Sequence, residues 1–493
     1  MFWLCVHFPA LALENFARAS SRPLETAPAV IVEAERVVQR NAAAERAGIR
    51  LGSTLATAQS LCHSLAFQVR DSNGERRRLK FLADAAYRFS SLVSVLEPSH
   101  VLLEVEGSLA LFGGVYRLKR RLKQLFAELG HQTSLGLAHT PAASVVLARA
   151  GKTGCTSAWP TVATLVRDSL EALDDIELRF TECDAGLIER LSNMGITRLG
   201  QLFRLPAVEL GRRFGPDFVG DLARLTGKRA DPRIGITPSP EFRTSIHLLE
   251  AITQRETLAF SMQRLIGDLV GWLTSRQLGV TRLRWTFAAF GGNPVVLEVD
   301  LAEPQRSRKT LLALSRLRLE RSELPDEILT IGLEALSFAA WQGPSGSLLN
   351  ETAALDVTPA QLLDQLKVRL GTSACRGLET VDDHRPEHAW RDTPPDPHPG
   401  KNRRDGALRK QPGSPLRPLW LLEKPRPVPR AQLRLLQGPE RIETGWWDTE
   451  PSRAAANRDY YVARWVDEFP NRGPCWVFTD RRDGQWYLHG YFG

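Results

Sequence analysis

The sequence predicts an α+β protein of several domains, and three observations lead to that prediction. The chain has 493 residues, enough for roughly three to four domains of ordinary size. Short apolar runs of strand length alternate with amphipathic stretches of helical spacing. Residues 391–418 are rich in Pro, Gly and Arg and precede an aromatic-rich C-terminus. We therefore expect a folded body, a flexible linker and a small β-rich module at the end.

The composition is that of a soluble chain with a basic balance. No apolar run approaches the ~18 residues of a membrane helix, and no basic region precedes the short apolar N-terminus, so neither a membrane span nor a signal peptide is expected. The six cysteines lie far apart without a C-x-x-C pair, which argues against a zinc site or disulfide framework and favours the cytoplasm. The net charge of +8 favours a nucleic-acid partner, although a solvated basic surface gives the same charge.

The first 150 residues predict the order β-α-β-α-α-β-α-β-α, in which the residues at 42–62 form two helical pieces broken at Gly48 and Gly52. Strands are expected at 1–8, 28–34, 99–114 and 133–138, and helices from about 10 and at 42–62, 75–94, 117–130 and 141–151. The helix at 117–130 is basic on one face and carries leucines on the other. Its cations meet either a phosphate backbone or only water.

Residues 187–206 predict two short helices around Met194, Gly195 and Ile196. A helix-hairpin-helix motif uses such a turn to direct backbone N–H groups at a DNA phosphate, and glycine permits the close approach. Arg198 beside the turn adds a cation. An ordinary αα-hairpin with a glycine C-cap gives the same pattern.

Residues 241–340 predict the order β-α-β-β-α-β, which is a ferredoxin-like arrangement. The second strand alternates apolar residues with Arg282, Arg284 and Thr286. One face of this sheet is therefore expected to be partly cationic and suited to a DNA duplex. A solvated outer face is the alternative.

The C-terminal segment concentrates aromatic residues, and Asp483-Gly484 predicts a hairpin turn. Because Trp and Tyr are enriched at interface hot spots, we expect a partner-docking module. A compact β-core that uses its tryptophans only for itself remains the alternative. The candidate docking residues are Trp446, Trp447, Trp465, Trp476 and Trp486.

These segments, in this order, resemble the Y-family translesion DNA polymerases over residues 1–340. "LCVHFPALALENF" is similar to the family's first strand, and "AAAERAGIRLGSTLATAQSLC" to its fingers segment. "EPSHVLLEVEGSLALFGG" is similar to its strand with an Asp-Glu pair, and "SLGLAHTPAASVVLARAGK" to its later palm segment. The resemblance implies palm and fingers, a helix-hairpin-helix thumb and a ferredoxin-like little finger.

The resemblance also shows which catalytic residues are missing. Two-metal phosphoryl transfer needs carboxylates around both ions. The matching positions hold His7, with Pro9 nearby, and then Ser99 and His100. None of these is a hard anionic ligand suited to magnesium. We therefore expect no catalytic residue, no metal and no cofactor.

The nucleotide-binding positions have changed as well. The family's phosphate-gripping Tyr and Arg align with Ala42 and Glu45, while Lys152 falls near its triphosphate lysine. A rescued metal site would have to use Glu104 and Glu106, with Glu14 nearby. Exposed or helix-capping roles are the plainer interpretation of these glutamates.

The segments "LFGG", "RPLWLLEKP", "GPERIETGWWD", "RDYYVARW", "CWVF" and "WYLHGYF" resemble one branch of the family. The resemblance implies that this branch is inactive and comes from bacterial mutagenesis cassettes. The resemblance implies DNA-damage (SOS) induction and work on damaged or primer-template DNA in the cytoplasm, at the nucleoid. It implies three protein partners: the β sliding clamp, a RecA-like protein and an error-prone polymerase α subunit. The candidate clamp peptide is Ser345, Gly346, Ser347, Leu348 and Leu349.

The domains expected are palm and fingers, thumb, little finger, a clamp-peptide and helical segment, the linker and the docking module. Their boundaries are 1–170, 171–238, 239–340, 341–390, 391–418 and 419–493. Two other functions stay open. One is an active translesion polymerase that uses atypical carboxylates, and the other is a DNA-binding repair factor unrelated to polymerases.

Overall fold

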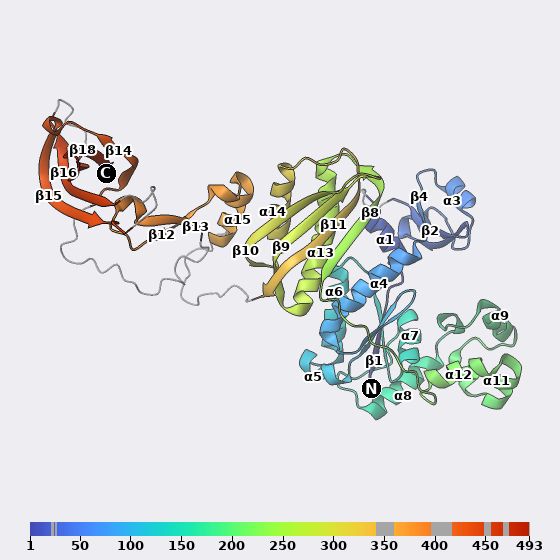
Figure 1. Cartoon of the computed structure of the whole chain (residues 1–493). Helices are drawn as coiled ribbons and strands as arrows, with labels where there is room; N and C mark the ends of the chain where they lie inside the picture. Colours follow the sequence, from blue (N-terminus) through green and yellow to red (C-terminus); the bar gives the residue numbers. More distant parts are fainter. Residues whose placement is uncertain are drawn as a thin grey trace. The chain divides into compact units, whose positions relative to one another are not determined.

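The structure is a computed structural model, and it forms two compact units, Met1–Thr352 and Ala353–Gly493 (Figure 1). The described residues are 1–20, 24, 27–341, 359–395, 417–447, 455–466 and 473–492. The α+β fold of several domains is confirmed, because each unit has its own sheets and its own buried clusters. Among the described residues, no helix is long and apolar enough to cross a membrane.

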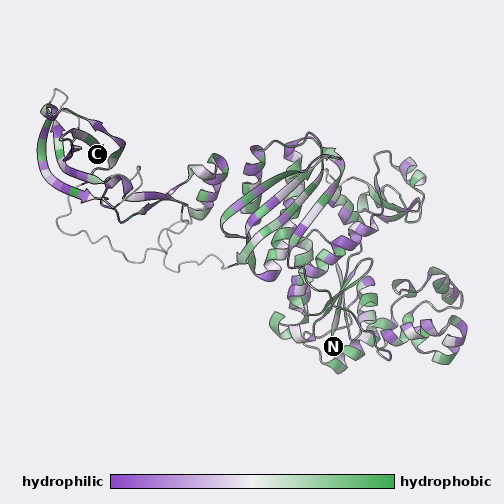
Figure 2. Ribbon diagram, viewed as in Figure 1, coloured by the Kyte–Doolittle hydropathy of each residue, from purple (hydrophilic) through white to green (hydrophobic). Residues whose placement is uncertain are grey.

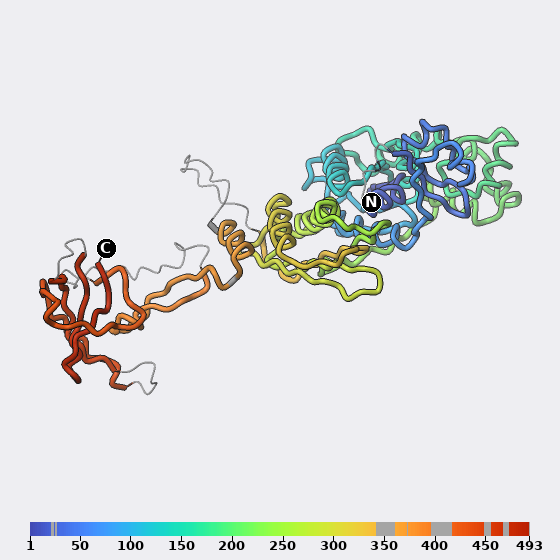
Figure 3. The backbone as a smooth tube through the Cα atoms, turned by 90° about the horizontal axis from the view of Figure 1, so that it is seen from above, coloured from blue at the N-terminus to red at the C-terminus, as the bar shows by residue number. Residues whose placement is uncertain are grey.

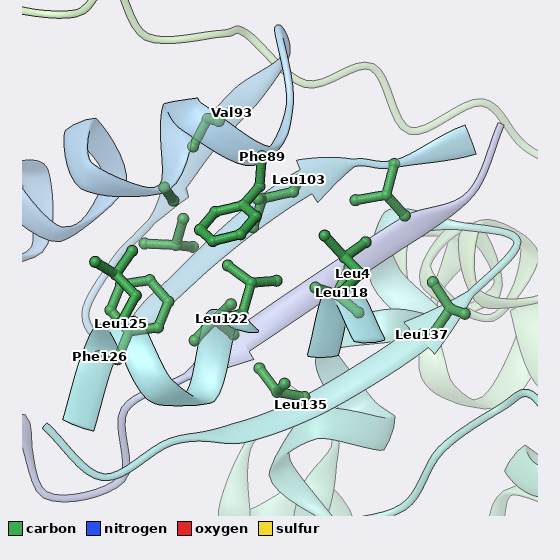
Figure 4. Close-up of a cluster of buried hydrophobic side chains, with 14 of the residues drawn as sticks. Leu4, Phe89, Val93, Leu103, Leu118, Leu122, Leu125, Phe126, Leu135 and Leu137 are labelled. Carbon is green, nitrogen blue, oxygen red and sulfur yellow. The ribbon is translucent and has the colours of Figure 1, made fainter. Parts of the chain in front are cut away.

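The first sheet of the N-terminal unit has the antiparallel order β5-β6-β1-β7. Its strands are β5 (Val93–Leu96), β6 (His100–Glu104), β1 (Trp3–His7) and β7 (Ser134–Ala138). One face packs on α4 (Ser72–Ala86) and α6 (Val115–Glu128), and α7 (Pro141–Arg149) covers the other. Figure 4 shows leucines of α6 interlocked with those of β1, β6 and β7. The apolar face of the predicted basic helix therefore builds this core.

Two elements of this region differ from the sequence prediction. The expected helix 75–94 ends at Ala86, is followed by a short 3-10 turn, and gives way to β5. Tertiary pairing overrides helix propensity here, because β5 completes the sheet edge beside β6. The expected strand 99–114 ends at Glu104. Gly113 and Gly114 instead close the short helix α5 (Leu109–Phe112), with φ of 72° and 94°.

The strand expected at 28–34 belongs to a separate sheet, in the order β3-β2-β4. Its strands are β2 (Ala29–Glu33), β3 (Arg36–Arg40) and β4 (Ala66–Val69). The sequence predicts only the first of these three strands, because β3 and β4 are short and become strands by pairing with β2. The two helical pieces predicted beside it are present as α2 (Ala42–Arg46) and α3 (Leu55–Leu61).

A helical subdomain follows, with its own apolar cluster that continues from α7. Its helices are α8 (Val162–Asp174), α9 (Ala185–Asn193), α10 (Leu199–Phe203), α11 (Ala207–Phe214) and α12 (Pro216–Leu225). The predicted hairpin is present between α9 and α10. Gly195 lies there at a φ of 80°, a left-handed conformation that favours glycine.

The next subdomain has the predicted β-α-β-β-α-β order. Its elements are β8 (Phe242–Ile252), α13 (Arg255–Arg276), β9 (Leu278–Ala288), β10 (Val295–Gln305), α14 (Arg308–Glu320) and β11 (Ile328–Ala340). The sheet order is β10-β9-β11-β8, so β11 separates the two strands of the βαβ unit. Hydrophobic and hydrophilic residues alternate along these strands (Figure 2), as a sheet with one covered face requires.

A buried charge cluster joins this subdomain to the first one. The Asp268 carboxylate on α13 is 1% exposed. It accepts from Arg78 of α4 at 2.9 Å and also from Arg18 of α1 (Leu11–Ala19). Arg78 donates further to the His131 ring at 2.8 Å. Since a buried carboxylate is tolerated only when it is paired, these contacts tie the two subdomains together.

The C-terminal unit contains a five-stranded sheet in the order β14-β18-β17-β16-β15, which confirms the predicted β-rich module. Its strands are β14 (Trp420–Pro427), β15 (Leu433–Thr444), β16 (Ala456–Trp465), β17 (Cys475–Asp480) and β18 (Trp486–Tyr491). Their path runs from orange to red in Figure 3. The predicted Asp-Gly turn joins β17 to β18, with Gly484 at a φ of 70°.

This unit also includes residues that precede the predicted linker. They form α15 (Pro359–Leu370) and the hairpin of β12 (Gly377–Thr380) and β13 (Trp390–Thr393). Glu387 within this hairpin pairs with Arg458 of β16 at 2.8 Å. The first residues of the predicted linker, 391–393, therefore belong to strand β13. Residues 396–416 of the linker lie outside the described part of the chain.

The Asp268 cluster gives a stability prediction. Asp268→Asn leaves two guanidinium groups without their buried counter-charge, which costs about 3–5 kcal/mol. We expect the unfolding temperature of the N-terminal unit to fall by about 6 °C or more in calorimetry. Asp300→Asn, which breaks the exposed pair with Arg282, is the matched control. Equal shifts for the two variants would contradict a special role for the cluster.

Candidate functional site

The candidate site lies at the end of β1, where His7 and His100 meet across neighbouring strands. The two residues are directly paired in the β1–β6 register. Their rings stack with centroids 4.6 Å apart and planes inclined by 17°. His100 is 1% exposed, and His7 is half-buried. The positions at which the resemblance places metal-binding carboxylates therefore hold a stacked pair of imidazoles.

Arg149, the last residue of α7, contacts the histidine pair from the face of the sheet that α7 covers. Its Nε donates to His100 Nε2 at 3.1 Å, and its other nitrogens donate to Thr181 O and Glu182. Sequence reasoning missed this residue. Its signal was available, because Thr140 and Pro141 fix the start of α7 and so place Arg149 level with the strand end.

Burial and charge keep both imidazoles neutral. Burial, the neighbouring His7 and the Arg149 guanidinium together lower the pKa of His100 to about 3. The pKa of His7 is lowered to about 4, chiefly by burial and then by Arg149. Two neutral rings offer no anionic oxygen ligand, and the Arg149 guanidinium already has Glu182 as its partner. The stacked pair therefore lacks the hard ligands that magnesium prefers.

The remaining matched positions complete the strand end without adding a carboxylate. Ser99 Oγ lies 3.3 Å from His7 Nδ1, and the Ser99 carbonyl accepts from Phe8 N at 2.9 Å. Pro9 lies in the turn before α1, where its carbonyl accepts from Gln39. Among the described residues, no three His, Cys, Asp or Glu side chains gather as a metal site would need.

The glutamates considered for a rescued site lie elsewhere. Glu104 pairs with Trp3 in the β1–β6 register, so four residue steps along the strand, about 13 Å, separate it from His7. Its carboxylate accepts from Phe2 N and Glu106 N, while Glu106 pairs with the N-terminal amine. These are capping contacts, and the structure does not bring the two glutamates to the site.

Glu14 is also committed to another contact. It accepts from Gln132 N at 2.7 Å and lies 2.5 Å from His131 Nδ1. Burial raises the pKa of Glu14 to about 7. Its carboxylate is therefore held by His131, which Arg78 links to Asp268.

The residues matched to the family's nucleotide-binding positions lie on two different elements. Ala42 opens α2, and Glu45 on the same helix pairs with Arg40 at 2.5 Å. Lys152 lies in the turn after α7, 4.0 Å from the Asp175 carboxylate. Glu45 therefore keeps an acidic group where the resemblance implies a cation.

The hairpin between α9 and α10 uses its own amide groups internally. Gly195 N donates to Ser192 O and Ile196 N to Leu191 O, both at 2.9 Å. The amides of Thr197 and Arg198 donate to the Gln201 side chain. Met194 N also donates to Leu191 O. The described contacts thus leave no amide of residues 194–198 directed at a ligand, and Arg198 is paired with Asp175.

The two arginines of β9 also have acidic partners. Arg282 pairs with Asp300 at 2.5 Å, and Arg284 pairs with Glu298 at 2.8 Å and Glu334 at 3.5 Å. These acids come from the flanking strands β10 and β11, in register with the arginines. The face that the sequence predicts to be cationic therefore carries two cations among three carboxylates.

The tryptophans of the C-terminal unit fall into two groups. Trp446 is 79% exposed and Trp447 59% exposed, and their rings meet edge to face at 5.4 Å. Trp476 is buried against Tyr460, while Trp465 and Trp486 are partly buried against the sheet. Trp420 is exposed as well and was not selected from the sequence. The proposed clamp peptide, residues 345–349, lies outside the described residues.

Comparison with known sequences places these features in context. Residues 12–149 match the sequence model of the impB/mucB/samB family. Protein ImuB from two strains of Caulobacter vibrioides is 25% identical over 486 residues, which cover 90% of this chain and 100% of that protein. The resemblance to the Y-family polymerases, and to this branch of them, is thus confirmed.

Several solved structures are similar to the chain at a low level. They include an insertion ternary complex of Dbh DNA polymerase, with a TM-score of 0.40 and 14% identity. They also include DinB from Sulfolobus solfataricus, with a TM-score of 0.39 and 14% identity. Each covers 68% of this chain and 98% of its own. The fold assignment itself rests on this chain's strand orders and on the family match.

The neutral histidines give a pH prediction. Folding lowers the pKa values of both histidines from the ordinary histidine value of about 6.5. At a pH below that value, the unfolded chain therefore binds more protons than the native state does. The stability contributed by His7 and His100 is therefore present above pH 6.5 and is lost as the pH falls toward about 4. We expect the unfolding temperature to decline over this range.

The double variant His7→Gln/His100→Gln should flatten that decline, as measured by calorimetry at successive pH values. His63→Gln, which removes an exposed imidazole, serves as the control. A wild-type unfolding temperature that is constant between pH 6.5 and 4 would contradict the assignment of neutral, buried rings.

Proposed function

We propose that this chain is a non-catalytic, polymerase-like adaptor in SOS-induced, error-prone translesion DNA synthesis. In this role it links the β sliding clamp, a RecA-like partner of the ImuA type and an error-prone polymerase α subunit on damaged DNA. The α subunit supplies the catalysis. The resemblance to Protein ImuB along 90% of the chain supports this assignment.

One observation carries the non-catalytic part of the proposal. His7 and His100 stack where two-metal chemistry needs carboxylates, and Arg149 donates to their ring pair. A magnesium ion at this place would meet a guanidinium and two neutral nitrogens instead of hard oxygen ligands. The site thus lacks the ligands for the step that the family performs.

The C-terminal unit supports the docking part of the proposal. Trp446 and Trp447 expose a paired aromatic surface beside a sheet that already has its own core. Exposed tryptophans of this kind are typical interface anchors. Trp476, by contrast, serves the core, so docking rests on the exposed pair and not on all five residues. The RecA-like protein is the first candidate partner, and the α subunit the second.

An active polymerase is the alternative function, and primer extension separates the two. We expect no templated incorporation by the purified protein with Mg²⁺ or Mn²⁺, because the metal positions hold no carboxylate. Incorporation that survives purification and disappears in Glu104→Ala/Glu106→Ala would overturn the adaptor assignment, since only an intrinsic carboxylate site loses activity in that variant.

The triple variant His7→Asp/Ser99→Asp/His100→Glu should remain inactive in the same assay. Arg149 lies against position 100, and Ala42 and Glu45 still stand where the family has its phosphate-gripping Tyr and Arg. Polymerisation by this variant would show that the three substitutions alone account for the missing activity.

The docking surface gives a prediction in cells. We expect Trp446→Ala/Trp447→Ala to reduce damage-induced mutagenesis to the level seen when residues 353–493 are deleted, because both remove the exposed aromatic pair. Trp159→Ala, which truncates an exposed tryptophan of the N-terminal unit, is the matched control. DNA binding by the purified double variant should stay unchanged. Normal mutagenesis with the double variant would exclude this pair as the docking site.

A further inference from the structure

The basic face of α6 forms one side of a pocket that also includes Lys152, the lysine matched to the family's triphosphate contact. Lys119, Arg120 and Lys123 line it from α6, and Lys152 and Thr153 line it from the turn after α7. The pocket has a volume of about 410 Å³. This volume can hold a phosphate group and part of the molecule to which the phosphate is attached. Four cations thus converge on one concave surface.

These cations differ from the other arginines and lysines considered as DNA contacts. Arg198, Arg282 and Arg284 each have a carboxylate partner. Within the part of the chain that the structure describes, no carboxylate lies at ion-pair distance from Lys119, Arg120 or Lys123, and the contact of Lys152 with Asp175 is at the 4.0 Å limit. The positive charge of this pocket is therefore available to a ligand.

The geometry around Lys119 shows how the charge is held in place. Its Nζ donates to Thr153 Oγ1 at 2.5 Å, which directs the ammonium toward the turn. Burial and the neighbouring Lys123 lower the pKa of Lys119 to about 8. Holding several ammonium groups together costs free energy, and a bound anion removes that cost.

We propose that this pocket on α6 binds a phosphate group, either of a nucleic-acid backbone or of a free phosphate compound. Lysine is a compact point charge with three donors, and clustered lysines suit phosphate without requiring one fixed orientation. The Thr153 hydroxyl adds a neutral donor at the rim. The proposal rests on the three cations of α6, and it holds whether or not the chain acts as an adaptor.

The test measures how tightly two probes bind the full chain. One is fluorescently labelled single-stranded DNA, followed by anisotropy, and the other is inorganic pyrophosphate, followed by calorimetry. The pocket variant is Lys119→Gln/Lys123→Gln. The matched control is Arg117→Gln/Arg121→Gln, which removes the same charge from the same helix at side chains that lie against Gly113 and Phe112.

If the pocket binds the DNA backbone, the pocket variant should lose about tenfold or more in DNA affinity at about 0.1 M salt. The slope of log K against log salt should fall by about 1.4, because each lost phosphate contact contributes about 0.7 for single strands. If the pocket binds a free phosphate compound, only pyrophosphate binding should weaken. In both cases the control should change much less.

Two results would overturn the proposal. One is equal weakening of both probes by the pocket variant and the control, since that reflects total charge and not a site. The other is binding of both probes that the pocket variant leaves unchanged. Calorimetric unfolding of both variants verifies that neither effect comes from loss of the fold.

Discussion

The N-terminal unit depends on the way in which β1 is buried on both faces. Phe2, Leu4, Val6 and Phe8 face the helices α4 and α6, while Trp3 and Cys5 face α7. Because a strand alternates its side chains strictly, this packing fixes the register of β1 against β6 and β7. His7 is then placed at the strand end whatever its chemistry. The fold therefore does not need the residues that occupy the catalytic positions.

This separation explains how a polymerase-like scaffold can persist with other residues at its site. A cluster of carboxylates at one strand end carries mutual repulsion, which costs stability unless metals are bound. The stacked rings of His7 and His100 are neutral and bury their surface against each other. Arg149 gains hydrogen bonds to His100, Thr181 and Glu182 in the same place. The strand end is therefore stabilised by its own contacts, and none of them requires a bound cation.

The sequence predicted the segment order because hydrophobic period and turn residues carry that information locally. The βαββαβ order and the Asp-Gly hairpin of the C-terminal sheet are of this kind. The strand β5 escaped prediction, because Val93–Leu96 continues a helical pattern and only its partner β6 decides otherwise. The buried strands of the core were likewise predictable from the sequence, whereas the Arg149 contact depends not only on where α7 begins but also on how α7 lies against the sheet.

The charge state of surfaces was the least predictable property. Arg282 and Arg284 form a cationic stripe in the sequence, yet their partners Asp300 and Glu298 come from the next strand and meet them only through the observed register. The same limit applies to the tryptophans. Aromatic density predicted a docking surface, but only the fold separates exposed Trp446 from Trp476 in the core.

The stacked histidine pair and the cationic pocket both adjoin the edge strand β7. Ser134 lies opposite His7, and its hydroxyl donates to Ala148 O on the α7 side. The next residue, Leu135, belongs to the α6 side and lines the pocket. Alternation along one strand thus places Arg149 on one face of the edge and the α6 cations on the other. Arg149 is paired with Glu182, whereas the α6 cations have no carboxylate at ion-pair distance among the described residues, so the α6 face is the one whose charge favours an anion.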